Sequence, residues 1–316
     1  MRPILLVFVS IFLGACTAKP GSPAARTGDE IVIAGHFFHT GAPVVLWLDE
    51  GGYDAYRVER RFVPKDAMNW EQSKEKIATP QRYGIRAAGL SEAEFERVRG
   101  GGWSLPDLRE RIDQFVLHYD VCGTSRECFR VLHDARGLSV HFLLDIDGTI
   151  YQTMDVKERA WHATIANDRS VGIEIANMGA YAAVAGSPLE KWYGDDGSGR
   201  TRITLPAIRG DGGVRTPDFV GYPERLVTGD VGGRTLTMYD FTPEQYESLE
   251  KLTEALCAAL PKIRRDYPRS EGGELLNRTL TPEEFRNFSG VLGHYHIQEN
   301  KADPGPALQW DRVVGR

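Results

Sequence analysis

The sequence predicts an α/β fold in which a mixed central β-sheet is flanked by helices and preceded by an N-terminal β-rich subdomain. The first observation is that short apolar runs alternate with helical patterns from Pro106 onward, as in a sheet covered by helices. The second is that residues 30–60 carry closely spaced β-like runs. Hydrophobic residues make up 41% of the 316 residues and charged residues 26%, which is enough apolar material for a folded core.

Residues 1–16 are predicted to be an export signal that is not part of this fold. A basic start precedes an apolar stretch over residues 3–15, which is too short to cross a bilayer core of about 30 Å as a helix. The stretch ends in Leu13-Gly14-Ala15-Cys16, which resembles the lipobox of bacterial lipoproteins, where the cysteine receives a lipid. An ordinary signal peptide with an incidental Cys16 is the alternative. Residues 17–28 are expected to be a flexible tether.

Export determines what is expected of the cysteines. A lipid on Cys16 would anchor the protein in the cell envelope. Thr17, rather than Asp, beside Cys16 argues against retention in the inner membrane of a Gram-negative host, so an outer-membrane anchor facing the periplasm is expected. In an oxidising compartment Cys122 and Cys128 are expected to form a disulfide, with a metal site as the alternative. Cys257 lies in an apolar helical pattern and is expected to be a buried free thiol.

The N-terminal subdomain is predicted over residues 29–105. Residues 31–33, 44–48 and 53–58 have the composition of short strands, and Gly51-Gly52 predicts a hairpin turn between the last two. Residues 91–99 are expected to form a helix. The sequence does not indicate what this region does.

The second domain is predicted over residues 106–316. Its strands are expected at residues 115–117, 140–146, 149–153 and 171–175. Asp147-Gly148 predicts the hairpin turn between the middle two. Capping residues predict helices that begin after Thr124 and after Thr242. A Gly- and Asp-rich insertion near residues 182–238 is expected to form long surface loops.

Two histidines and an aspartate are candidate metal ligands. His118 and His294 each follow a short apolar run, so both imidazoles are expected at strand ends. Asp303 comes nine residues after His294. Two imidazoles and one carboxylate leave a fourth zinc position for water, as hydrolysis requires. Taken singly, each histidine also fits a hydrogen-bonded structural role.

Five separated segments of this domain, spread over residues 106–312, each carry a specific motif. They are Phe115-Val116-Leu117-His118-Tyr119, Ser139-Val140-His141-Phe142-Leu143 with its Asp147-Gly148 turn, Ala160-Trp161-His162-Ala163, Asn167-Asp168-Arg169-Ser170-Val171-Gly172-Ile173-Glu174, and Gly293-His294 with Lys301-Ala302-Asp303-Pro304-Gly305-Pro306. Together they resemble the zinc-dependent N-acetylmuramoyl-L-alanine amidases of the type-2 amidase and peptidoglycan-recognition-protein superfamily. The subgroup they resemble most is the lipid-anchored amidases of the bacterial envelope. The Cys122–Cys128 pair resembles a short-loop disulfide of many recognition proteins.

This resemblance implies a function and a set of roles. The implied reaction is hydrolysis of the amide bond between N-acetylmuramic acid and L-alanine in peptidoglycan or muropeptides, with one Zn²⁺ per chain and release of stem peptides. The implied zinc ligands are His118, His294 and Asp303. Glu174 is implied as the proton-transferring carboxylate and Lys301 as the residue that stabilises the oxyanion. The implied substrate contacts are Trp161, His162 and Asn167.

Two residues depart from the family's pattern. Asp120 stands where a small or hydroxyl residue is common, and His296 stands where many members have an acidic one. Either residue can be expected to orient a zinc ligand or to compete as one. The spacing from His294 to Asp303 is one residue shorter than in close relatives. His141 is expected to support the core, and the remaining histidines, His36, His39 and His133, to be surface or structural.

Two other functions fit parts of the sequence. A muropeptide-binding lipoprotein without catalysis is the stronger alternative, although all three ligand positions are retained. Residues 142–149 also fit the first motif of magnesium-dependent haloacid-dehalogenase-type phosphatases, with Asp145 as nucleophile and Asp147 as acid–base. The later acidic pair of that fold is not found after an apolar strand. With 38 basic and 44 acidic residues the net charge is −6, which argues against a nucleic-acid partner.

Overall fold

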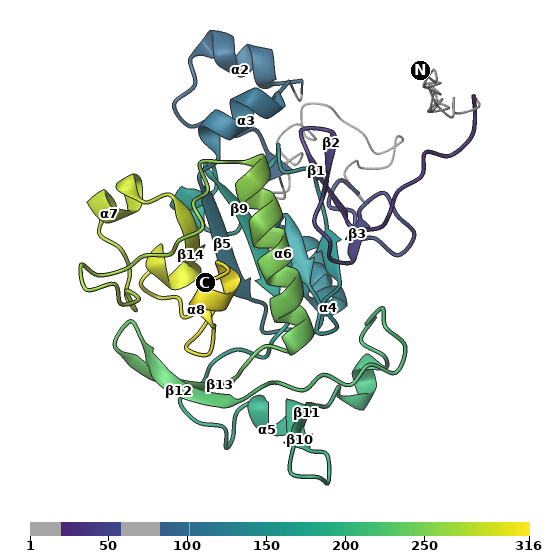
Figure 1. The fold of residues 1–316 in the computed structure, drawn as a ribbon, viewed down its shortest axis with the longest axis vertical. Coiled ribbons are helices and arrows are strands. Elements are labelled where there is room, and N and C mark those ends of the chain that lie inside the picture. Colours follow the sequence, from purple (N-terminus) through teal and green to yellow (C-terminus); the bar gives the residue numbers. More distant parts are fainter. Residues whose placement is uncertain (1–19, 58–82, 101) are drawn as a thin grey trace, which may run out of the picture.

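A six-stranded mixed sheet lies at the centre of the computed structural model, which describes residues 20–57, 83–100 and 102–316 (Figure 1). Its order is β14-β5-β9-β6-β7-β3. The strands are β3 (Val44–Leu46), β5 (Gln114–Tyr119), β6 (Phe142–Leu144), β7 (Ile150–Gln152), β9 (Ser170–Ile175) and β14 (Gly290–Gly293). The strands from β14 to β6 run parallel, β7 runs antiparallel to β6, and β3 runs parallel to β7. The predicted mixed α/β sheet is confirmed.

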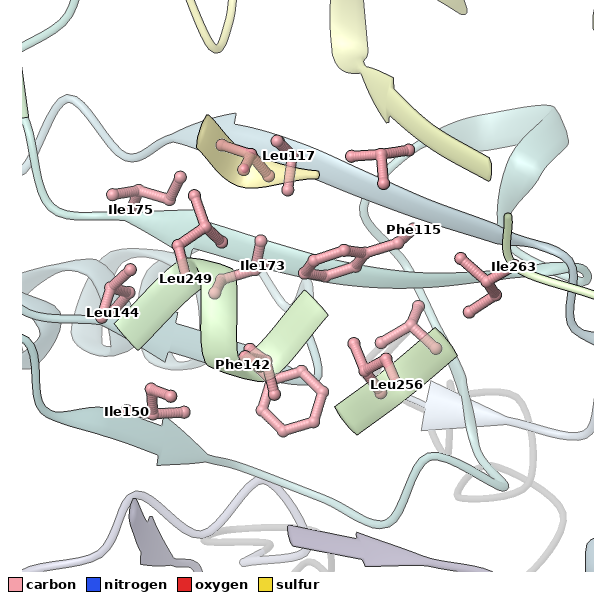
Figure 2. Close-up of a cluster of buried hydrophobic side chains, with 14 of the residues drawn as sticks. Phe115, Leu117, Phe142, Leu144, Ile150, Ile173, Ile175, Leu249, Leu256 and Ile263 are labelled. Carbon is pink, nitrogen blue, oxygen red and sulfur yellow. The ribbon is translucent and has the colours of Figure 1, made fainter. Parts of the chain in front are cut away.

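Helix α6 (Pro243–Ala259) covers one face of this sheet (Figures 1 and 2). It begins as predicted, because the Thr242 side chain accepts the backbone N–H of Gln245 and the Gln245 side chain accepts that of Thr242. Leu249 and Leu256 of α6 share one buried cluster with Phe115 and Leu117 of β5 (Figure 2). Side chains alternate along a strand, so residues between these two in β5 face away from α6.

Shorter helices surround the sheet. They are α2 (Glu92–Val98), α3 (Leu105–Arg111), α4 (Ser125–Phe129), α5 (Leu189–Trp192), α7 (Pro282–Asn287) and α8 (Trp310–Val313). The helix expected at residues 91–99 is α2, which Ser91 caps, and the predicted cap at Thr124 is confirmed, because Thr124 accepts the N–H of Glu127 at the start of α4. A π-helical turn, η2 (Arg130–Ala135), continues α4. Among the described residues, no helix is long and apolar enough to span a membrane.

The N-terminal region is β-rich, as predicted, and it shares its core with the rest of the chain. Strands β1 (Glu30–Ile33) and β2 (His36–His39) form a hairpin whose β1 side chains lie in the main hydrophobic cluster. Strand β3 is the edge of the central sheet. A further short strand, β4 (Tyr83–Gly84), pairs with β8 (Arg159–Ala160) of the second domain.

The predicted hairpin at Gly51-Gly52 is wrong within the described residues. Strand β3 pairs in parallel with β7 and ends in a turn, in which Asp49 N–H donates to the carbonyl of Leu46. Residues 53–57 form no strand. The aromatic ring of Tyr53 packs instead on Phe129 and Tyr151, with ring centroids 5.3 Å and 4.5 Å apart. Residue 58 lies outside the described residues.

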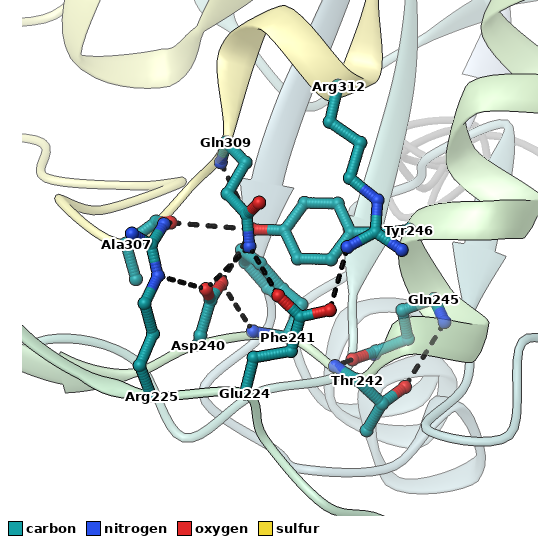
Figure 3. Close-up of polar contacts among 10 residues, drawn as sticks. All are labelled: Glu224, Arg225, Asp240, Phe241, Thr242, Gln245, Tyr246, Ala307, Gln309 and Arg312. Carbon is teal, nitrogen blue, oxygen red and sulfur yellow. Dashed lines mark hydrogen bonds and ion pairs between the residues drawn. The ribbon is translucent and has the colours of Figure 1, made fainter.

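The predicted loop system near residues 182–238 contains two β-hairpins. They pair β10 (Tyr193–Asp195) with β11 (Thr201–Ile203) and β12 (Leu226–Val231) with β13 (Arg234–Tyr239). The end of this insertion is tied to α6 and to the C-terminal segment by a polar network around buried Asp240 (Figure 3). Asp240 accepts hydrogen bonds from Arg225, Tyr246 and Gln309. The network thereby anchors the chain that follows Asp303.

Candidate active site

Three predicted ligand residues converge at the carboxyl edge of the sheet. His118 lies near the end of β5, and His294 opens the 3₁₀ turn η5 (His294–His296) directly after β14. These strands are parallel neighbours, so their ends lie side by side. Asp303 Oδ2 lies 2.8 Å from His118 Nδ1 and 2.9 Å from His294 Nδ1, and the two Nδ1 atoms are 3.0 Å apart. All three side chains are buried.

The hydrogen bonds of the outer ring nitrogens suit these histidines to metal binding. His294 Nε2 lies 2.6 Å from Gln298 Oε1, and His118 Nε2 lies 3.1 Å from His162 Nδ1. With a proton on each Nε2, both Nδ1 lone pairs face Asp303. Burial lowers the pKa of His118 to about 4, so its imidazole is neutral at pH 7, as a ligand must be. Two imidazole nitrogens and a carboxylate oxygen form a donor set that fits a zinc ion.

His162 orients a candidate ligand as well as lining the pocket. Its Nε2 lies 3.2 Å from Ser170 Oγ, and its Nδ1 meets His118. The ring fits behind His118 because Gly172 has no side chain: a Cβ there would lie 2.5 Å from His162 Nδ1. The resemblance implied only a substrate contact for His162. The signal in the sequence for this role is Gly172 of β9, against which the His162 ring lies.

The other two implied substrate contacts differ from each other. Trp161 lines the pocket and carries the guanidinium of Arg159 over its ring, 4.1 Å from the ring centroid. Asn167 is not among the pocket-lining residues and is only 3% exposed. Its Oδ1 accepts the backbone N–H groups of His162 and Ala163. In this structure Asn167 shapes the turn that carries His162, and its contact with substrate stays a prediction.

A pocket of about 180 Å³ opens beside the candidate ligands. Glu174 lines it from β9, at the position paired directly with His118 of β5. Burial raises the pKa of Glu174 well above its ordinary value, and the charges of Asp303 and Asp120 raise it further. Lys301 lines the same pocket from the loop that carries Asp303. The pocket thus brings together a carboxylate, an amine and the three converging ligand atoms.

The two residues that depart from the family's pattern lie outside the cluster of ligand atoms. Asp120 Oδ1 accepts backbone N–H groups of Cys122, Gly123 and Asn177, so this carboxylate shapes the turn after β5. Burial raises the pKa of Asp120 to about 7. His296 is fully buried, where its Nδ1 accepts the N–H of Gly293 and its Nε2 lies 2.8 Å from the carbonyl of Leu276. Neither residue competes as a ligand in this structure.

The cysteines that were expected to form a disulfide are free thiols in the structure. Cys122 and Cys128 both line the pocket and belong to one hydrophobic cluster. The two side chains thus lie in the same part of the fold, and the disulfide stays a prediction. Cys257 is a free thiol, as expected, but it is only partly buried.

The phosphatase alternative does not fit the fold. Asp145 and Asp147 lie in the turn between the antiparallel strands β6 and β7. Asp147 Oδ1 accepts the N–H of Thr149, and its Oδ2 accepts the N–H and hydroxyl of Thr216. These are the contacts of a hairpin turn, and both carboxylates are buried. The hairpin predicted from the same residues is confirmed.

An α/β sheet with these groups at its strand ends has the make-up of a hydrolase with a three-ligand metal centre. Residues 108–306 match the family model described as N-acetylmuramoyl-L-alanine amidase, and the chain belongs to this family. The family's activity is hydrolysis of an amide bond in peptidoglycan, so this chain is an enzyme of that class.

Solved structures of three such amidases are similar to parts of this chain. A selenomethionine derivative of AmpD is 19% identical, with a TM-score of 0.34 over 74% of this chain and 89% of that one. AmiD from E. coli, in complex with anhydro-N-acetylmuramic acid-L-Ala-D-gamma-Glu-L-Lys, is 20% identical, with a TM-score of 0.38 over 65% of this chain and 57% of that one. The endolysin LysCS from Clostridium intestinale is 15% identical, with a TM-score of 0.34 over 66% and 84%. No curated protein matches the sequence.

Proposed function

We propose that the chain is a zinc-dependent amidase that cleaves the bond between N-acetylmuramic acid and L-alanine and releases stem peptides. The observation that carries this proposal is the convergence of His118 Nδ1, His294 Nδ1 and Asp303 Oδ2 within 3.0 Å of one another. A zinc ion held by these atoms would supply a Lewis acid and lower the pKa of a bound water toward about 7.

Glu174 is the proposed acid–base group. It stands beside His118 on the neighbouring strand and lines the pocket. Its raised pKa makes the carboxylate a stronger base, which suits a group that must first accept a proton from water and then deliver it to the departing amine. Proton transfer of this kind contributes about 10²–10⁴-fold to a rate.

Lys301 is the proposed electrostatic stabiliser of the transition state. Its position two residues before Asp303 places it on the same loop as a ligand, and its side chain lines the pocket. Its ammonium group would face the negative charge that develops on the carbonyl oxygen. One such donor can be worth about 3 kcal/mol.

Metal analysis combined with a turnover assay tests this function. The purified protein is expected to hold about one zinc per chain and to cleave a muramoyl-L-alanine amide. A chelator should remove both the metal and the activity, and added zinc should restore both. Binding of muropeptides at one zinc per chain without any turnover would instead support the non-catalytic lipoprotein.

We also propose that Cys122 and Cys128 form a disulfide after export, supported by their place in one hydrophobic cluster beside the same pocket. In the exported protein, denatured without reductant, thiol labelling should reach Cys257 and neither of the other two. In a Cys122→Ser variant, Cys128 should become reactive as well. Labelling of Cys122 and Cys128 without reduction would contradict the disulfide.

A lipid anchor at Cys16 in the outer membrane is the proposed location, and it rests on the lipobox alone because residues 1–19 lie outside the described residues. A Cys16→Ala protein is expected to leave the membrane fraction and to keep its amidase activity, because the anchor takes no part in the chemistry. Fractionation with an activity assay measures both. A Cys16→Ala protein that stays in the membrane fraction would disprove the anchor.

A further inference from the structure

Arg86 is a fully buried arginine that comes from the N-terminal region. Among the described residues it forms no ion pair, and a buried guanidinium without a carboxylate partner is costly. Burial lowers its pKa to about 9, so it remains charged at pH 7. The cost of burying the Arg86 guanidinium indicates that its contacts matter to the fold or to the site.

The hydrogen bonds of Arg86 go to both ends of one segment. Its Nε and Nη2 donate to the carbonyl of Val156 at 3.3 Å and 3.0 Å, and its Nη1 donates to the carbonyl of Asn167 at 2.9 Å. Its Nη2 also lies 3.0 Å from His141 Nε2. The planar fork of an arginine can span two carbonyls in this way. Arg86 therefore connects the two ends of the segment of residues 156–167 through hydrogen bonds.

This segment carries the two pocket residues Trp161 and His162. The N-terminal region supports it at a second point, because Gly84 lies against the indole of Trp161, where a Cβ would come within 3.0 Å of the ring. His162 in turn meets His118 Nε2 at 3.1 Å, which fixes the direction of the His118 Nδ1 lone pair. A continuous series of contacts therefore links Arg86, through Asn167 and His162, to the candidate ligand His118.

We infer that Arg86 is a positioning residue for the metal centre: it holds the 156–167 segment so that His162 keeps His118 aimed at the metal. The N-terminal region is then part of the active site and not only an appendage to it. This inference rests on the proposed zinc function. It also gives a physical reason for the buried charge: without the hydrogen bonds of Arg86, the segment and His162 could shift.

Zinc affinity of the metal-free protein, measured by competition with a fluorescent chelator, tests the inference. Arg86→Met keeps an unbranched side chain that fills most of the space of the arginine stem, and removes its donors. We expect it to weaken zinc binding by about 10-fold to 100-fold, the usual effect of losing support for a ligand. Exposed Arg97, which pairs with Asp107 at the surface, provides a matched control, and Arg97→Met should leave zinc affinity unchanged.

A double-mutant cycle separates positioning from a general loss of stability. If Arg86 acts through His162, the Arg86→Met change should have less than about twofold effect on zinc affinity in a His162→Ala protein. Losses that multiply in the double variant would overturn the inference, as would normal zinc affinity in Arg86→Met. Should Arg86→Met fail to fold, the same cycle is run with Arg86→Lys, which keeps the charge but lacks the fork.

The wild-type titration distinguishes the two possible failures. A wild-type protein that binds no zinc would overturn the proposed function together with this inference. Normal zinc binding by the wild type, with no loss in Arg86→Met or Arg86→Lys, would overturn only the role of Arg86.

Discussion

Replacing His294 with alanine is expected to abolish zinc binding and amide hydrolysis together. The metal would be held by only three protein bonds, and His294 Nδ1 supplies one of them. Because affinity is the sum of so few bonds, the remaining His118 and Asp303 should not retain the ion. Zinc content after dialysis and turnover on a muropeptide measure the two losses.

His36→Ala is the matched control, because this histidine is exposed on β2 and belongs to no candidate site. It should retain one zinc per chain and full activity. Circular dichroism establishes that both variants are folded. A His294→Ala protein that kept its zinc and its activity would mean that the ligands have been assigned wrongly.

Glu174→Gln should behave differently, because it removes a proton acceptor and leaves the ligand atoms in place. Zinc content and fold are expected to be unchanged, while kcat falls by about 10²–10⁴-fold. The surface change Glu96→Gln in α2 should leave zinc content, fold and kcat unchanged. Steady-state kinetics on zinc-loaded protein make the comparison.

Near-full activity in Glu174→Gln would move the acid–base role to another group. Asp120 would be the first candidate, because it lines the same pocket and its Oδ2 is buried without a hydrogen-bond partner in the structure. An Asp120→Asn variant would then have to lose the activity that Glu174→Gln retained.

The elements that the sequence predicts well are those determined by neighbouring residues. The cap at Thr242 and the turn at Asp147-Gly148 each depend on contacts within a few positions, and both are found as predicted. Strand β5 was predicted because a short apolar run is long enough to identify a buried strand. The motifs around His118, His294 and Asp303 likewise placed three residues that converge in space.

The features that were missed depend on partners far away in the chain. Strand β3 ends early because it joins β7, about a hundred residues later, and Tyr53 leaves the strand pattern to pack on Tyr151. The hairpin strands of the insertion are mostly exposed or only partly buried, so they lack the buried apolar residues by which a strand is recognised in the sequence.

Side-chain roles within the site were the hardest to predict. The burial of Arg86 runs against the ordinary preference of arginine for the surface, and its partners lie about 70 residues or more along the chain, except for His141 at 55. Asn167 stands within a motif of substrate-binding residues, yet its amide oxygen is taken up by two backbone N–H groups. A motif locates such residues near the site without showing which way they face.

Mass spectrometry of peptidoglycan digested by the purified protein tests the central claim most directly. Hydrolysis of the bond between N-acetylmuramic acid and L-alanine predicts free stem peptides that begin with L-alanine, together with intact glycan strands that have lost them. Both products should disappear in the Glu174→Gln and His294→Ala digests. Peptides cut at an internal bond, fragmented glycan, or an unchanged substrate in the presence of bound zinc would contradict the proposed reaction.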